Sequence, residues 1–183
     1  PDATLVGGES KYYPCLFDHE FIPQVEDLEA LVDENTVAIL YNFPSNPTGG
    51  TLNEQQRDDL LAFAKKHDLW IISDEVYDRI VFEEDHVSFM GTGYDKLMVV
   101  NSFSKTFAMT GWRIGYIIST NLEAMKQVVK IQYYISACSN DAMQYAVLEA
   151  MEKANDYPDE MATEFQKRCN LIVDRLNAMP GVQ

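Results

Sequence analysis

The chain has 183 residues, a net charge of −15, and hydrophobic and aromatic fractions of 46% and 11%. These fractions exclude a disordered chain and are typical of a globular domain. The strong negative charge argues against general binding to nucleic acid or to anionic membranes, because both repel an acidic surface. No apolar run approaches the length of a membrane span, and no basic-then-apolar signal segment starts the chain.

The three cysteines are scattered and odd in number: Cys15, Cys138 and Cys169. Their spacing fits neither a zinc site nor a disulfide framework. We therefore expect free thiols in a reducing compartment, the cytoplasm.

Short apolar runs alternate with amphipathic stretches over the first two thirds of the chain. The runs predict strands at 37–41, 69–72, 97–100 and 114–118, and the amphipathic stretches predict helices at 26–34 and 51–67. Continuous apolar runs of this length indicate strands covered on both faces, as in a parallel sheet. After residue 120 only helices are predicted, at 121–134, 141–154 and 159–178. The pattern predicts an α/β fold, a three-layer α/β/α arrangement with a mostly parallel sheet, followed by a long C-terminal helical segment.

In open sheets of this kind ligands bind beyond the carboxyl ends of the strands, so the polar residues there are the candidate site. Asn46-Pro47-Thr48-Gly49 has the composition of a turn, and alone it indicates only a strand–helix connection. Asp74 could cap a helix, bind a metal or pair with a cationic ligand. No histidine lies beside it, so no metal site is expected; the three histidines are interpreted as ordinary surface or loop residues: His19, His67 and His86.

Ser102, Ser104 and Lys105 follow directly after a predicted buried strand. Burying an ammonium group without a partner is costly, so Lys105 either pairs with an acid or acts, uncharged, as a nucleophile toward a carbonyl. Arg113 enters the next strand between Gly111 and Gly115, which permit close backbone approach. An arginine at this place could bind a phosphate through two hydrogen bonds.

Taken together and in this order, these motifs resemble a known family. The series Asn46-Pro-Thr-Gly, Asp74-Glu-Val-Tyr, Ser102-Phe-Ser-Lys and Gly111-Trp-Arg-Ile-Gly-Tyr is similar to that of the class I/II, fold-type I pyridoxal-phosphate aminotransferases. The aspartate and aromatic aminotransferase branch is the most similar. The likeness runs along the chain but corresponds to the middle of a full family member.

The resemblance implies a role for each motif residue with pyridoxal 5′-phosphate as cofactor. Lys105 would form a Schiff base with the cofactor and move the substrate proton, and Asp74 would pair with the pyridine nitrogen. Tyr77 and Asn46 would bind the 3′-oxygen, with an Asn46–Pro47 bond that is often cis in the family. Two further residues would bind the phosphate, Ser102 and Arg113; Ser104 could assist through its hydroxyl, and Gly111 and Gly115 would allow backbone approach.

The resemblance also implies a domain division. Residues 1–157 would form part of the cofactor-binding major domain, and residues 158–183 an interdomain helix that leads to a small domain outside this chain. We expect the isolated chain to be inactive, and its full-length parent to be a homodimer that transfers an amino group from an aspartate-type or aromatic L-amino acid to a 2-oxo acid.

Two other functions are compatible with the same motifs. A C–S β-lyase or an enzyme like aminocyclopropane-carboxylate synthase would share the lysine, aspartate and tyrosine, since reaction type in this fold depends on residues outside the chain. A non-enzyme alternative is the ligand-sensing domain of a transcriptional regulator. No segment of the chain is basic or resembles a helix-turn-helix.

Overall fold

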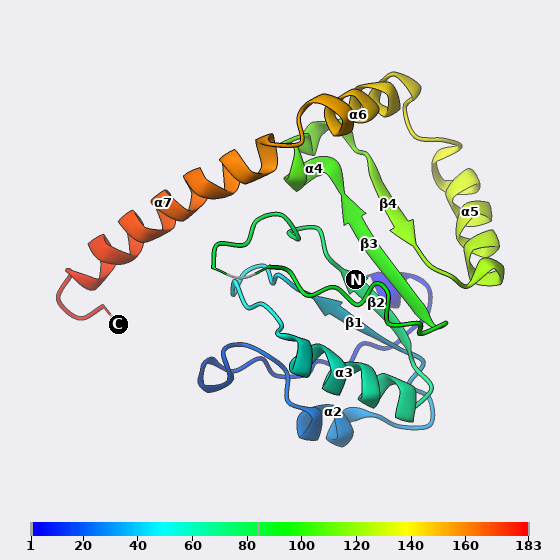
Figure 1. The fold of residues 1–183 in the computed structure, drawn as a ribbon. Helices are drawn as coiled ribbons and strands as arrows, with labels where there is room; N and C mark the ends of the chain where they lie inside the picture. Colours follow the sequence, from blue (N-terminus) through cyan, green and yellow to red (C-terminus); the bar gives the residue numbers. More distant parts are fainter. Residues whose placement is uncertain (1, 84, 183) are drawn as a thin grey trace.

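The structure is a computed structural model and describes residues 2–83 and 85–182. Its centre is a sheet with the strand order β1-β2-β3-β4 (Figure 1): β1 Ala38–Asn42, β2 Trp70–Asp74, β3 Leu97–Ser102 and β4 Gly115–Ile118. The first three strands are parallel, and β4 pairs antiparallel with β3. The predicted α/β fold with a mostly parallel sheet is confirmed.

The direction of β4 follows from the short connection that precedes it. A parallel neighbour requires a long crossover, usually through a helix that packs on the sheet. Between β3 and β4 the chain forms only the small helices α4 (Phe103–Thr106) and η2 (Thr110–Trp112). The chain therefore reverses direction beside β3, and Gly115 at the start of β4 pairs with Ser102 at the end of β3.

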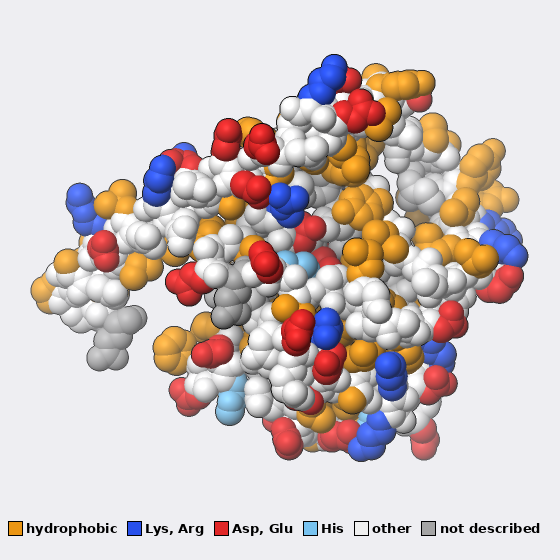
Figure 2. Space-filling model, viewed as in Figure 1, with side chains coloured by type: hydrophobic (Ala, Val, Ile, Leu, Met, Phe, Trp, Pro, Cys, Tyr) orange, Lys and Arg blue, Asp and Glu red, His pale blue; other side chains and the backbone are white. Residues whose placement is uncertain are grey.

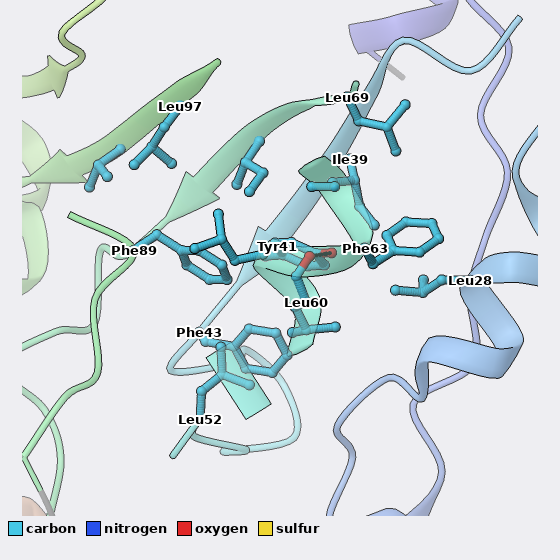
Figure 3. Close-up of a cluster of buried hydrophobic side chains, with 14 of the residues drawn as sticks. Leu28, Ile39, Tyr41, Phe43, Leu52, Leu60, Phe63, Leu69, Phe89 and Leu97 are labelled. Atoms are coloured by element: carbon cyan, nitrogen blue, oxygen red, sulfur yellow. Dashed lines mark hydrogen bonds between the residues drawn. The ribbon is translucent and has the colours of Figure 1, made fainter. Parts of the chain in front are cut away.

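One face of the sheet is buried beneath α3 (Glu54–Lys66), with α2 (Val25–Leu31) next to it (Figure 1). Asn53 starts α3 with a capping box: its side chain accepts from the Gln56 backbone amide, and the Gln56 side chain accepts from the Asn53 backbone amide, both at 2.9 Å. Figure 3 shows the resulting core, in which the ring of Tyr41 stacks on Phe89 at 5.4 Å and contacts the α3 face that carries Leu60 and Phe63.

The opposite face is only partly covered by the described residues. Leu40 on β1 is 55% exposed and Ile118 on β4 is 41% exposed, whereas Ile39 and Tyr41, which alternate with Leu40, are buried. The prediction that the strands are covered on both faces is therefore wrong for β1 and β4 within this chain. Strand alternation instead separates a buried face from an accessible one.

The remaining helices lie outside this core. α1 (Asp2–Leu5) and η1 (Phe17–His19) precede β1, and α5 (Leu122–Ser136), α6 (Asp141–Lys153) and α7 (Tyr157–Asn177) follow β4. The three long helices match the predicted ones to within two residues at each end. Figure 1 shows α7 extending away from the sheet, and apolar side chains on it are accessible, with Ile172 61% exposed.

Apolar side chains are also accessible on α5, where Val129, Tyr133 and Ile135 are exposed (Figure 2). No described helix combines the length and the apolar character required to cross a bilayer.

Candidate functional site

The carboxyl ends of the three parallel strands meet at one edge of the sheet. Asn42 at the end of β1 is in register with Asp74 at the end of β2. The amide of Glu75 donates to the carbonyl of Val100 on β3 at 2.9 Å, so the chain beyond β2 continues beside β3. Because β4 is antiparallel, its first residues and the preceding Arg113 lie at the same edge. The predicted site residues thus lie together at the carboxyl ends of the parallel strands.

Asn46, Tyr77 and Lys105 form a contact chain across this edge. The side-chain amide of Asn46 donates to the Tyr77 hydroxyl at 3.2 Å, and the Lys105 ammonium lies 5.4 Å from the centre of the Tyr77 ring. The Asn46 amide donates to the side chain of Asn42 at 3.0 Å, which fixes the turn after β1, and the Asn46–Pro47 bond is cis, as the resemblance implied. Three side chains that are far apart in sequence therefore meet at one place.

Asp74 is a half-buried carboxylate at the end of β2. Its Oδ1 accepts from the Val76 amide at 3.3 Å, a short-range contact that resembles a helix cap. Burial raises the pKa of Asp74, and the hydrogen bonds from Val76 and Asn42 only partly oppose this effect. A carboxylate with a raised pKa is stabilised in its charged form when a cationic group binds next to it.

Lys105 is placed by the helix start that follows β3. The Ser102 side chain caps α4 by accepting from the Ser104 amide at 3.1 Å, and its hydroxyl also lies 2.9 Å from Ser104 Oγ and 3.1 Å from the Ile114 carbonyl. Ser102 is therefore bonded inside the protein, and it ties the Lys105 helix to the chain that enters β4.

Arg113 has a left-handed backbone, with φ of 57°. Its guanidinium donates to the Thr110 carbonyl at 2.9 Å and is otherwise accessible. Within the part of the chain that the structure describes, no hydrogen bond or ion pair joins its side chain to the other five predicted cofactor-binding residues. Arg113 lies beside Ile114, whose carbonyl accepts from Ser102.

The two glycines of this motif differ in their surroundings. A Cβ on Gly115 would lie 2.8 Å from the Asn101 carbonyl oxygen, whereas a Cβ on Gly111 would meet no atom within 4 Å. Close backbone approach within the chain is therefore confirmed for Gly115 and not found for Gly111.

The charged groups of the edge have no ionic partners among residues 2–83 and 85–182. No ion pair joins Asp74, Lys105 or Arg113 to another side chain in this part of the protein. The same residues contain no group of three histidines, cysteines or carboxylates arranged as metal ligands. One carboxylate and two cations thus remain available to a ligand that carries both kinds of charge.

His86 lies in a loop, as interpreted, but the interpretation missed its contact with a buried carboxylate. Its Nε2 lies 2.9 Å from the Glu75 carboxylate, and Glu75 itself is only 3% exposed. The sequence pattern did give one indication that Glu75 is buried, because side chains alternate between the two faces of a strand and the residue directly after Asp74 points to the opposite, buried face. The partner is 11 positions along the chain, in a segment without periodicity, and no pattern indicated it.

Comparison with known proteins places the chain in a family. The sequence profile described as Aminotransferase class I and II matches residues 1–183. An aspartate aminotransferase of Thermotoga maritima is 39% identical over 181 residues, which are 98% of this chain and 47% of that protein. An aromatic-amino-acid aminotransferase 2 of Thermococcus litoralis is 35% identical over 184 residues, with 98% and 47% covered.

The solved structures agree with the sequence comparison. The crystal structure of an aromatic aminotransferase from Pyrococcus horikoshii superposes with a TM-score of 0.91 at 34% identity, over 97% of this chain and 49% of that one. The fold and these matches define an α/β protein of the aminotransferase type. The chain belongs to the class I and II aminotransferase family, and it spans about half the length of the curated relatives it matches.

Proposed function

We propose that the full-length protein containing this chain is a pyridoxal-phosphate-dependent aminotransferase. The observation that carries the proposal is the set of charges without ionic partners among the described residues at the carboxyl ends of the strands, Asp74, Lys105 and Arg113. Pyridoxal phosphate carries a protonatable ring nitrogen, a phosphate and an aldehyde. It therefore offers a partner to the carboxylate, to the guanidinium and to the amine.

Each residue has a role that its position supports. Asp74 would hold the proton on the ring nitrogen, since burial disfavours its charge until a cation binds. Tyr77 and Asn46, already bonded to each other at 3.2 Å, would hydrogen-bond the 3′-oxygen. Arg113 would bind the phosphate through its guanidinium. Ser102 would also bind it, by turning its hydroxyl proton from Ser104 Oγ or the Ile114 carbonyl toward a phosphate oxygen.

Lys105 is the residue that would attach the cofactor and handle the proton. Its ammonium lies over the Tyr77 ring, so a lysine freed by the incoming amino acid would remain at the site to move a proton at the substrate Cα. When bound, pyridoxal phosphate supplies an electron sink for the carbanion that this proton transfer creates.

We assign the substrates from the relatives' names. Aspartate-type or aromatic L-amino acids would be the donors and a 2-oxo acid the acceptor. Residues 1–157 would be part of the cofactor-binding major domain, and residues 158–183 the helix that leads to a small domain. The exposed apolar side chains of α7 and α5 support further partners for these helices, a small domain and a second copy in a homodimer. The thiols Cys15, Cys138 and Cys169 are free, which supports a cytoplasmic protein.

The test is to incubate the full-length protein with pyridoxal phosphate, an L-amino acid and 2-oxoglutarate and to identify the products. Aspartate and an aromatic amino acid are tried as donors, and Lys105→Ala serves as the inactive control. Formation of glutamate and the matching 2-oxo acid supports the proposal. Release of ammonia and pyruvate from a β-substituted substrate, without glutamate, would assign a β-lyase, and no turnover of any amino acid would leave the sensor function.

A further inference from the structure

Glu75 is a buried carboxylate that adjoins the proposed site without lying in it. It follows Asp74 directly and points to the opposite face, where it is 3% exposed. Its Oε1 accepts from the Ser73 hydroxyl at 2.8 Å and from the Phe89 amide at 3.1 Å, and its Oε2 lies 2.9 Å from Nε2 of His86. All three groups face this one carboxylate.

These contacts close a long loop upon itself. Residues 75–83 and 85–89 form no helix or strand. Backbone hydrogen bonds fix the first part of this loop, from the Glu75 amide to the Val100 carbonyl of β3 and within the turns at residues 75–80. Glu75 stands at the start of this loop, and its partners His86 and Phe89 stand at the end. The Glu75 carboxylate thus holds the two ends of the loop together through hydrogen bonds.

A second contact joins the same loop to β3. The side-chain amide of Asn101 donates to Oδ2 of Asp78 at 2.9 Å, and Oδ1 of Asn101 accepts from the Ser102 amide at 2.6 Å. Asn101 is 6% exposed, so this bond is shielded from water. The loop is therefore held at both sides of Tyr77, at Glu75 before it and at Asp78 after it.

Tyr77 is the point at which this scaffold meets the proposed site. Its hydroxyl accepts from Asn46 at 3.2 Å and its ring lies 5.4 Å from the Lys105 ammonium. We propose that Glu75 and His86 are positioning residues, which act through the loop that they close to hold Tyr77 against Asn46 and Lys105. This inference rests on the proposed function.

The charge state of Glu75 agrees with this role. Burial alone would raise its pKa, but hydrogen bonds from His86, Ser88 and Ser73 together hold the pKa of Glu75 below its ordinary value. The carboxylate is therefore charged at neutral pH. A buried charge that loses a hydrogen-bonding partner is strongly destabilised, so the loop cannot leave His86 without cost.

The test uses the full-length protein and two readouts other than turnover. One is the dissociation constant for pyridoxal phosphate, and the other is the pH midpoint of the absorption change of the bound cofactor. Glu75→Gln is expected to weaken the binding of pyridoxal phosphate about tenfold, the size of effect known for residues that position a binding residue without touching the bound group. It should also shift the pH midpoint of the absorption change. The matched control is Glu29→Gln, because Glu29 pairs with His67 at 3.1 Å but joins α2 to α3. It should change neither readout.

A double-mutant cycle separates positioning from general stability. In a Tyr77→Phe background, Glu75→Gln should shift the midpoint far less than in the parent protein, because Glu75 acts through the tyrosine. Additive shifts would overturn the proposal. If Glu75→Gln does not fold, His86→Asn replaces it in the same cycle, since it keeps the carboxylate and changes one donor.

The outcomes separate this inference from the proposed function. A parent protein that binds no pyridoxal phosphate would overturn the proposed function. A parent that binds it, with variants of Glu75 and His86 that match the parent in both readouts, would overturn the positioning role alone.

Discussion

Replacing Gly115 by alanine should open the junction between β3 and β4 beside Lys105. The added Cβ would lie 2.8 Å from the Asn101 carbonyl oxygen and 3.5 Å from Cα and Cβ of Ser102. Ordinary carbon–oxygen contacts begin at about 3.3 Å, so β4 must move by about 0.5 Å. The obstructing atom is backbone within a strand ladder and cannot rotate away. Overpacking of this kind costs about 1–3 kcal/mol.

The assay is thermal unfolding of the cofactor-free, full-length protein, compared with Gly111→Ala. Gly111 belongs to the same motif but has open space around its Cβ position, so its alanine variant should be as stable as the parent. In a domain of 150–250 residues 1 kcal/mol corresponds to roughly 2–4 °C, and Gly115→Ala should lower the Tm by several degrees. A Gly115→Ala variant with the parent Tm, or equal losses in both variants, would refute the steric argument.

Two further substitutions test the site and the core. Asp74→Asn should weaken pyridoxal phosphate binding yet stabilise the cofactor-free protein at neutral pH by less than about 1 kcal/mol, since water screens this half-exposed carboxylate. Because the folded-state pKa of Asp74 is raised, the stabilising protonated form of Asp74 is lost as the pH rises through that pKa. The stability advantage of the Asn variant should therefore grow with pH. Urea unfolding at acidic and neutral pH checks this, and an Asn variant less stable than the parent at neutral pH would contradict it. Asn53→Ala removes the capping-box bond that the Asn53 side chain accepts from the Gln56 amide, and it should cost about 1 kcal/mol in the same urea measurement. An unchanged midpoint would show that this cap is dispensable.

The elements and the shared edge were predictable because they depend on local patterns. The apolar runs predicted each strand, and the alternation with helices predicted parallel pairing. Parallel strands end at one edge, so Asn46, Asp74 and Lys105 were expected to lie close together before any contact was known. The contact chain through Tyr77 confirms that geometry for Asn46 and Lys105, and the pairing of Asp74 with Asn42 puts Asp74 at the same strand ends. The roles of these residues stay predictions.

What the sequence did not predict depends on contacts between distant residues. The apolar run 114–118 predicts a strand but does not show whether that strand is parallel or antiparallel to its neighbour. The short connection from β3 makes β4 antiparallel and brings Arg113 to the site. Leu40 has the same local pattern as its buried neighbours, yet few described residues cover it. The burial of Glu75 likewise requires His86 and Phe89, which arrive through a loop without periodicity.

The central claim is that Lys105 is the residue that carries the cofactor. The most direct measurement is to load the full-length protein with pyridoxal phosphate, reduce it with borohydride, and locate the modified lysine by peptide mass spectrometry. The account predicts one adduct, on the peptide containing Lys105, and none in Lys105→Ala. An adduct on any other lysine of the parent protein, or no adduct at all, would contradict it.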